Sequence, residues 1–296
     1  MFVGGLPALA QVAAPLAPST AFPVSIVSPD NASALAINPS ALGSVDGWSI
    51  AFSHVSPVDR SVYADRTDAA WVAAEVGKMV SLGAGLDFTR SRTPDLPDSN
   101  NGVLGAALNM GTSWSLGAVW RIRSPHVNQS NIHTADVGLT FRPAPTLGVS
   151  LIGRELAAQD LRIGTVPLRR SGVLAIVTRP LGDDRFMLEI AGLVDEKERM
   201  GARVAAQAMI PYVGRLGASG EYNETAGYES WTFTAGLDVR WGGISLAPAL
   251  HGADTGDINW SMLVDIHGKP RIGIPAPRYV AKVASGETGP RGLLSV

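Results

Sequence analysis

Apolar and polar residues alternate strictly along residues 229–241, which read E-S-W-T-F-T-A-G-L-D-V-R-W. One face of this stretch is wholly apolar and carries a Trp near each end, Trp231 and Trp241, ten positions apart. Ten positions of extended chain cover ~33 Å. Tilted by ~40°, such a strand rises ~25 Å, the height of the apolar band between the aromatic girdles of an outer-membrane β-barrel. The pattern therefore predicts a membrane-spanning β-strand.

The same period of two recurs along the chain, and we expect fourteen strands. They cover about residues 47–55, 68–76, 78–90, 102–110, 112–123, 133–142, 146–155, 171–181, 185–195, 200–210, 214–223, 230–241, 243–252 and 257–267. The segments 68–76, 171–181 and 243–252 alternate less clearly. Pro248 lies inside the last of these, although proline is disfavoured within a paired strand.

The connections between these segments differ in length at the two predicted rims. Every second connection has one to three residues, such as Gly77, Gly111 and residues 211–213. The intervening connections near the N-terminal half are long and polar: 56–67, 91–101, 124–132 and 156–170. Outer-membrane barrels have short periplasmic turns and long outer loops. We therefore predict an all-β, antiparallel up-and-down transmembrane β-barrel of about fourteen strands, with both termini in the periplasm.

The composition fits a membrane barrel better than a soluble enzyme. Charged residues make up 17% of the 296 residues, below the ~25% typical of soluble chains. The net charge of −2 does not suggest a nucleic-acid partner, and cysteine is absent, which excludes disulfide and thiolate chemistry. Aromatic residues reach only 6%, which is little for two full girdles. We therefore expect a modest grip on outer-membrane lipid.

The alternation assigns candidate side chains to each face of the barrel. The predicted lipid-facing aromatic girdle comprises Trp48, Trp114, Trp120, Trp231, Trp241 and Trp260. The predicted lumen carries charges of both signs, with Arg121, Asp136, Arg142, Glu189, Arg203, Asp238 and Arg240 as the main candidates. Unpaired charges in a narrow lumen are costly, so we expect pairing across the lumen. Many inward Gly and Ala leave room for a ligand channel as the alternative.

Catalytic and cofactor signals are weak. The five histidines are scattered, without the spacing of a metal site, and we expect neither a metal nor a cofactor. Gly83-Ala84-Gly85 has no following helix, so a dinucleotide site is not expected. A Ser–His pair could assemble from distant strands. No such pair is recognisable in the sequence, and we do not expect an enzyme.

The two ends of the chain differ in composition from the predicted barrel. Residues 1–10 are apolar and small and end on Ala8-Leu9-Ala10, which fits the end of a secretory signal peptide. Residues 11–46 begin with several prolines and are expected to be irregular at first, forming a periplasmic or plug segment. The barrel is expected to cover 47–267. Residues 268–296 are expected to form a periplasmic tail or linker.

Residues 30–43, D-N-A-S-A-L-A-I-N-P-S-A-L-G, come directly before the first predicted strand. They resemble the "A…NPA.L" signature that precedes the barrels of the long-chain fatty-acid transporter and PorV-like outer-membrane families. The chain departs from this signature at Ser40, with Ala one place later. Those families have fourteen strands, and their segment enters the periplasmic mouth of the barrel. The resemblance implies that Asn38 and Pro39 are structural plug residues.

A second resemblance concerns the strand order, Asp195-Glu196-Lys197, and the Pro-, Gly- and Lys/Arg-rich tail after residue 268. These features are similar to the N-terminal region of long signal-peptide-peptidase-A-like proteins of myxobacterial type. In those proteins a barrel-like region precedes a serine peptidase. No residue of this chain matches the context of a peptidase nucleophile, so no catalytic residue is carried over.

Three functions follow from these observations. The first, which we favour at this stage, is a membrane anchor or scaffold for a periplasmic domain or protein partner, without catalysis in this chain. The second is a channel of the fatty-acid transporter type for a hydrophobic small molecule. The third is a soluble β module of a serine peptidase. The third predicts a chain that stays in solution without detergent, whereas the first two predict the opposite.

Overall fold

The computed structural model describes residues 24–29, 31–58, 66–76, 79–90, 98–111, 113–126, 130–157, 162–163, 166–183, 185–197, 200–225, 228–241, 243–253 and 258–268. The predicted signal-peptide remnant, residues 1–10, and the predicted tail beyond Gly268 lie outside these residues. None of the described helices is long and apolar enough to cross a membrane.

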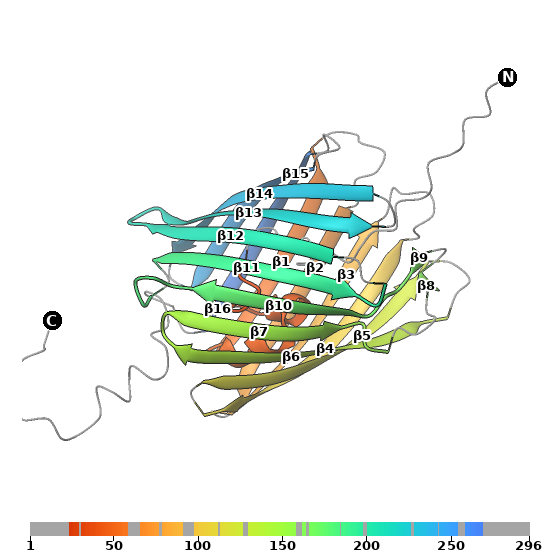
Figure 1. The fold of residues 1–296 in the computed structure, drawn as a ribbon, viewed down its shortest axis with the longest axis horizontal. Coiled ribbons are helices and arrows are strands. Elements are labelled where there is room, and N and C mark those ends of the chain that lie inside the picture. The colour runs from red at the N-terminus through yellow and green to blue at the C-terminus, as the bar shows by residue number, and fades with distance from the viewer. Residues whose placement is uncertain are drawn as a thin grey trace, which may run out of the picture.

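Fourteen antiparallel strands form one closed barrel (Figure 1). They are β1 (Trp48–Pro57), β2 (Arg66–Val76), β3 (Val80–Arg90), β4 (Ser99–Met110), β5 (Trp114–Pro125), β6 (Ile132–Ala144), β7 (Leu147–Arg154), β10 (Ser171–Thr178), β11 (Phe186–Asp195), β12 (Met200–Ile210), β13 (Gly214–Thr225), β14 (Tyr228–Trp241), β15 (Ile244–Ala253) and β16 (Ile258–His267). Strand β1 closes the barrel on β16, in register from Ser49↔His267 to Pro57↔Asn259. The predicted fourteen-strand barrel is confirmed.

Two local features differ from the expectation. The connection between β7 and β10 contains a small hairpin, β8 (Arg162–Ile163) and β9 (Val166–Pro167), which the alternation did not indicate. Pro248 lies within β15 despite its missing N–H, and it is paired with Met262 of β16. On its other side, the β14–β15 ladder runs to Gly236↔Ala249 and resumes at Val239↔Leu246. The wall tolerates the proline because the ladder omits two rungs there.

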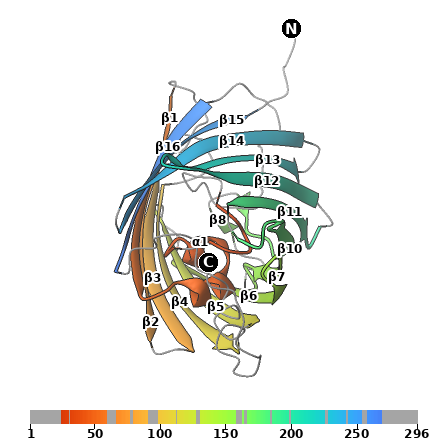
Figure 2. The ribbon, with the colours of Figure 1, turned by 90° about the vertical axis from the view of Figure 1, so that its left-hand side faces the viewer.

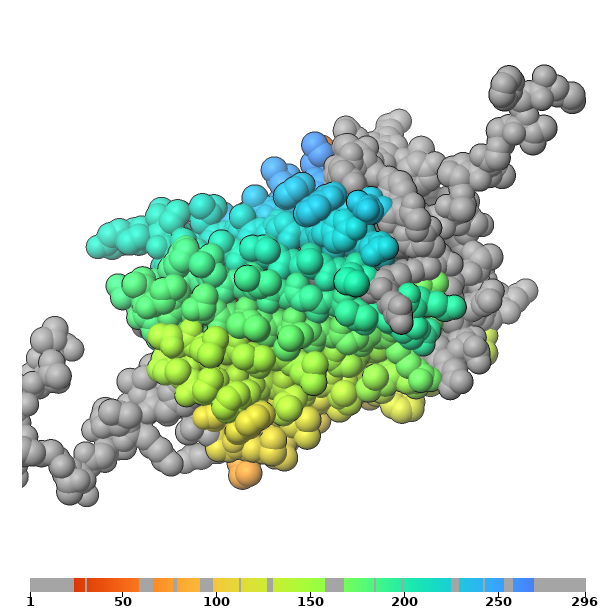
Figure 3. Space-filling model, in the orientation of Figure 1, coloured from red at the N-terminus to blue at the C-terminus, as the bar shows by residue number. Residues whose placement is uncertain are grey.

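The outward face of the barrel is apolar, as the alternation predicts. Large apolar side chains alternate with buried inward residues on each strand; Leu104, Ile190 and Phe233 are each at least 59% exposed. From yellow β5 to cyan β14 the wall forms one continuous surface (Figure 3). So much exposed apolar surface is characteristic of a membrane-facing wall rather than of a soluble domain.

Replacing Ile190 by Arg tests this wall directly. Ile190 lies in the middle of β11, faces outward and is 65% exposed. We expect Ile190→Arg to destabilise the barrel in a bilayer by about 2–4 kcal/mol, because the guanidinium would lie near the bilayer midplane. Leu181→Arg is the matched control, since Leu181 lies in the short turn before β11 and is 57% exposed. Folding titrations in liposomes measure both changes; an equal effect at the two positions would contradict the predicted membrane placement.

Residues 24–29 and 31–45 lie inside the barrel and contribute to its apolar core. The helix α1 (Ala34–Ile37) and the 3₁₀ helix η1 (Pro39–Ser44) contact the inner faces of β3, β4, β5 and β6 (Figure 2). Residues 24–29 have no regular structure, in agreement with the irregular segment expected here. The core is therefore formed between residues 24–29 and 31–45, which we call the plug, and the inward side chains of the strands.

Candidate functional site

The plug fills part of the lumen with apolar side chains. Ile26, Val27, Leu35, Ile37 and Leu42 are at most 1% exposed. They belong to the same core cluster as inward side chains of β2, β4, β5, β7, β10 and β11. These inward residues include Trp71, Val103, Val119, Ile152, Val173, Val177 and Met187. Part of the inner wall of the lumen is therefore an apolar surface that the plug covers.

Asn38 joins the two halves of the plug to the wall. Its Nδ2 donates to the Ile26 carbonyl at 2.9 Å and to the hydroxyl oxygens of Thr140 and Ser150 at 3.3 and 3.1 Å. Its Oδ1 accepts from the Ser40 N–H at 3.1 Å and from the Ser40 hydroxyl at 2.7 Å, which caps η1. Pro39, the other residue of the motif, is buried at the first position of η1, where a missing N–H costs little. The plug role of both residues stays a prediction that this placement supports.

Two inward glycines make room for the plug. A Cβ built on Gly138 of β6 would lie 2.6 Å from Asn38 Oδ1, and one on Gly117 of β5 would overlap the carbonyl of Pro39. The small inward residues at these positions therefore accommodate the plug backbone. The sequence suggested that such residues leave room for a ligand; at these two positions the room is occupied by the chain itself.

We expect Gly117→Val to displace η1 from the wall. The valine Cβ would collide with backbone rather than with a flexible side chain, so the plug must move. Overpacking of this kind costs about 1–3 kcal/mol. The matched control is Gly172→Val on β10, where a Cβ would meet nothing within 4 Å. Hydrogen exchange of the η1 amides measures the change. Unchanged protection in the Gly117 variant would contradict the close packing of η1 against Gly117.

Two arginines hold the carbonyl end of α1. The helix has only four residues, so its last carbonyls find few partners within it. Arg121 of β5 donates to the carbonyls of Leu35 and Ala36 at 3.2 and 3.3 Å, and Arg154 of β7 donates to that of Ile37 at 2.9 Å. Arg121 is in turn held by Asp136 of β6 at 2.7 Å. These side chains replace the missing partners and fix the helix to the wall.

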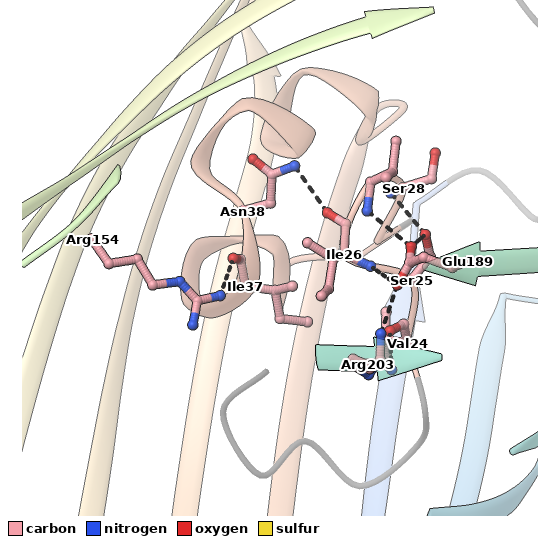
Figure 4. Close-up of polar contacts among 10 residues, drawn as sticks. Val24, Ser25, Ile26, Ser28, Ile37, Asn38, Arg154, Glu189 and Arg203 are labelled. Carbon is pink, nitrogen blue, oxygen red and sulfur yellow. Dashed lines mark hydrogen bonds and ion pairs between the residues drawn. The ribbon is translucent and has the colours of Figure 1, made fainter. Parts of the chain in front are cut away.

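A buried ion pair holds the start of the plug on the other side of the lumen (Figure 4). Glu189 of β11 and Arg203 of β12 lie 2.6 Å apart and are 2% and 3% exposed. The Glu189 carboxylate accepts hydrogen bonds from the Ser25 hydroxyl and from the N–H groups of Ile26 and Val27, at 2.5, 3.0 and 3.2 Å. Arg203 donates to the Val24 carbonyl at 3.0 Å. One ion pair therefore binds four consecutive residues of the plug.

Further polar contacts brace the plug near the short turns. Arg142 of β6 donates to the Val27 carbonyl and to the hydroxyls of Ser28 and Ser44. Asn109 of β4 donates to the Gly43 carbonyl at 2.8 Å. All of these contacts are hydrogen bonds or ion pairs, which can break and re-form.

The predicted lumen charges all face inward, and the ion pairs described among them are local. Arg121 and Arg203 pair with carboxylates on the adjacent strands, and Arg240 pairs with Asp238 of its own strand. Arg142 binds the plug. Pairing across the lumen stays a prediction; the pairs described here join neighbouring positions of the wall, and the plug takes up donors of Arg121, Arg142 and Arg203. Glu155 forms an ion pair with Arg123, and its backbone has a positive φ of 54°. The sequence analysis did not identify this residue.

The lumen is more open along β13 and β14. Inward Ser219, Thr232 and Thr234 keep part of their surface exposed, whereas inward Val173 and Ala191 of β10 and β11 are buried. Solvent therefore reaches the barrel interior along β13 and β14, and the plug fills it along β10 and β11. Nearer the short turns, Asp238 and Arg215 are buried, so this solvated side is narrower there.

A Ser–His contact does assemble from separate strands. His251 Nε2 of β15 lies 2.6 Å from the Ser261 hydroxyl of β16, and His251 Nδ1 lies 2.9 Å from the Thr234 hydroxyl. Ser261 is fully buried, and a threonine stands where a hydrolytic triad has a carboxylate. We therefore interpret these hydrogen bonds as structural contacts that join β14, β15 and β16. Within the described part of the chain, no group of three or more His, Asp or Glu side chains is placed to hold a metal.

The six predicted girdle tryptophans face outward. Trp48, Trp114 and Trp241 lie at the short-turn ends of their strands, Trp231 and Trp260 lie near the long-loop ends, and Trp120 lies between. Their role as a girdle stays a prediction. The seventh tryptophan, Trp71 of β2, faces inward and is 5% exposed. Trp71 alternates with the outward-facing Val72 and Val76, and this alternation in the sequence could have predicted its inward position.

Comparison with solved structures finds outer-membrane barrels. The monoaromatic hydrocarbon channel CymD has a TM-score of 0.58 and 11% identity, covering 81% of this chain and 93% of its own. A Pseudomonas aeruginosa FadL homologue has a TM-score of 0.58 and 9% identity, covering 87% and 98%. The chain has the fold of outer-membrane β-barrel channels. A bacterial polysaccharide outer membrane secretin is also similar, with a TM-score of 0.53 and 10% identity, covering 75% and 99%.

No family model matches the chain, and no curated protein matches it. At these identities the structural likeness establishes the fold alone. The fatty-acid transporter resemblance is supported at the level of the barrel. The PorV-like and peptidase resemblances stay predictions.

Proposed function

We propose that this protein is an outer-membrane channel of the fatty-acid transporter type, which admits a small hydrophobic molecule when the plug moves. The observation that carries the proposal is the plug itself: residues 24–29 and 31–45 occupy the lumen and are held there by hydrogen bonds, ion pairs and apolar packing. A scaffold that only anchors another domain does not need a barrel blocked by a separable segment. A channel does, because it must stay closed until its cargo arrives.

The residues beneath the plug support a hydrophobic cargo. Trp71, Val103, Val173 and Val177 face the lumen and are buried by the plug. Displacing the plug would turn these side chains into the wall of an apolar passage. Water-filled porin lumens are polar instead. The names of two similar structures, a monoaromatic hydrocarbon channel and a FadL homologue, agree with this class of cargo.

The anchor function, favoured from the sequence, has less support. It was favoured by the PorV-like and peptidase-type resemblances, which stay predictions, and the tail after residue 268 that would present a partner lies outside the described residues. The neighbouring structures favour the channel alternative, and nothing supports a peptidase module. The apolar outward wall also speaks against a soluble β module.

Uptake into cells tests the proposed function. The chain is expressed in a Gram-negative host that lacks its own fatty-acid channel, and uptake of a labelled C16 fatty acid, a labelled alkylbenzene and labelled sucrose is measured. We expect faster uptake of at least one of the two hydrophobic probes and no change for sucrose. A folded barrel in the outer membrane that speeds neither hydrophobic probe would contradict the channel, and selective sucrose uptake would indicate a porin instead.

A further inference from the structure

Two arginines face each other on the outer surface of the barrel at the rim of the long loops. Arg66, the first residue of β2, lies directly opposite Arg90, the last residue of β3. Both side chains are exposed and both point outward, on the same faces as Val72 and Phe88. Like charges directly opposite one another on adjacent strands are destabilising. The pair therefore calls for a negatively charged partner.

The described residues supply one carboxylate near the pair. Asp68 accepts from Arg66 Nε at 3.3 Å, but its other oxygen lies 2.5 Å from His54 Nδ1. Among the described residues, Arg90 has no hydrogen-bonding or ion-pair partner for its guanidinium. Within the described part of the chain, this single carboxylate, shared with a histidine, leaves donors of the two guanidinium groups unused. An external anion can use these donors.

The height of the pair on the barrel places it at a membrane surface. Ten residue steps separate Arg66 and Arg90 from Val76 and Val80 at the short-turn end of the same two strands. At ~3.3 Å per step and a ~40° tilt, the arginines lie ~25 Å above that end, which is the full height of the apolar band. They therefore lie at the level of the lipid headgroups of the leaflet on the long-loop side.

An apolar strip for an acyl chain runs down from the arginines. Phe88, Leu86 and Val72 are exposed on β3 and β2 below the pair, and Trp260 lies against His54 with a ring separation of 4.9 Å. A lipid whose headgroup lies between the arginines can lay its chains on this strip. By contrast, Glu224 and Glu229 face each other outward on β13 and β14, so a headgroup phosphate is repelled there.

We propose that Arg66 and Arg90 form a binding site for the phosphate of a membrane lipid headgroup in the leaflet at the long-loop rim. Arginine suits this ligand because its planar fork donates two parallel hydrogen bonds to phosphate oxygens. The site depends on the membrane placement of the barrel but not on transport through its lumen. It fixes the tilt and depth of the barrel in that leaflet and offsets the small number of aromatic residues.

Lipid binding by the full-length protein in detergent tests the site. The probe is diphosphoryl lipid A, compared with the same lipid after removal of both phosphates and with inorganic phosphate as competitor. Native mass spectrometry counts the bound lipid. We expect Arg66→Gln with Arg90→Gln to weaken binding of the phosphorylated lipid by roughly tenfold or more. Arg185→Gln, an exposed arginine at the opposite rim that pairs with Asp183, should leave binding unchanged.

Each other outcome overturns the proposal. Equal binding to the double variant, or equal binding of the dephosphorylated lipid, means that the arginines do not hold a lipid phosphate. Displacement of the lipid by an equal concentration of inorganic phosphate means a free-phosphate site. Heat-modifiable migration on a gel checks that the double variant folds; if it does not, Arg90→Gln alone decides, since Arg90 has no partner to lose among the described residues.

Discussion

Glu189→Ala is expected to open the channel. The Glu189 carboxylate holds Arg203 and three donors of the plug. Its loss leaves the buried guanidinium of Arg203 without its carboxylate and frees the start of the plug. Removing one partner of a buried ion pair costs about 3–5 kcal/mol. If this cost falls on the plugged state, the population of unplugged barrels rises by roughly 100- to 4,000-fold. Conductance in a planar bilayer measures the change as more frequent open events.

A double variant separates release of the plug from damage to the barrel. Replacing both members of a buried ion pair by apolar residues of similar size is often close to neutral for stability. Glu189→Leu with Arg203→Met should therefore keep a heat-modifiable barrel while still lacking the acceptor for the Ile26 and Val27 N–H groups. Asp183→Asn in a short turn is the surface control. Closed-channel behaviour of the double variant like that of the unchanged protein would contradict the role of this ion pair.

Asn38→Leu is expected to loosen the centre of the plug. Leucine leaves the Ile26 carbonyl and the Ser40 N–H without the side-chain partner that each has now. Each buried group left unsatisfied costs about 1–3 kcal/mol, so the plug should lose about 2 kcal/mol or more. We expect hydrogen exchange of the Ser40 amide to become about 30-fold faster or more.

Asn131→Leu is the control for this second prediction. Asn131 is exposed near the long-loop rim, where its side chain accepts from the Ser124 hydroxyl. This variant should leave exchange of the Ser40 amide unchanged. If Asn38→Leu also leaves it unchanged, the Asn38 contacts do not hold the plug, and the role implied by the N-P motif is wrong.

The strands were predictable because lipid and lumen impose opposite demands on alternate residues. That rule placed Trp231 and Phe233 outward and Glu189 and Arg203 inward without knowledge of any contact. It could not identify the partners of the inward charges. Glu189 binds residues more than 160 positions away in the sequence, and no local pattern encodes such a contact.

The plug was predictable as a segment but not as a structure. The motif around Asn38 and Pro39 pointed to residues before the first strand. The helix α1 has only four residues, too few for a helical period to be visible. Gly117 and Gly138 looked like free space in the lumen, since only the folded backbone reveals that Pro39 and Asn38 approach them.

A reversible lock on the plug tests the central claim most directly. The chain has no cysteine, so Ser40→Cys with Thr140→Cys introduces the only two thiols. The hydroxyl oxygens of Ser40 and Thr140 lie 2.6 Å apart. Sulfur atoms in these two positions would have a separation close to the ~2.05 Å length of a disulfide bond. Uptake of the hydrophobic probes is measured in cells before and after reduction. The proposed mechanism predicts no uptake while the disulfide holds and recovery on reduction. Equal uptake by the oxidised and reduced protein, with the disulfide verified by mass spectrometry, would contradict a channel closed by this plug.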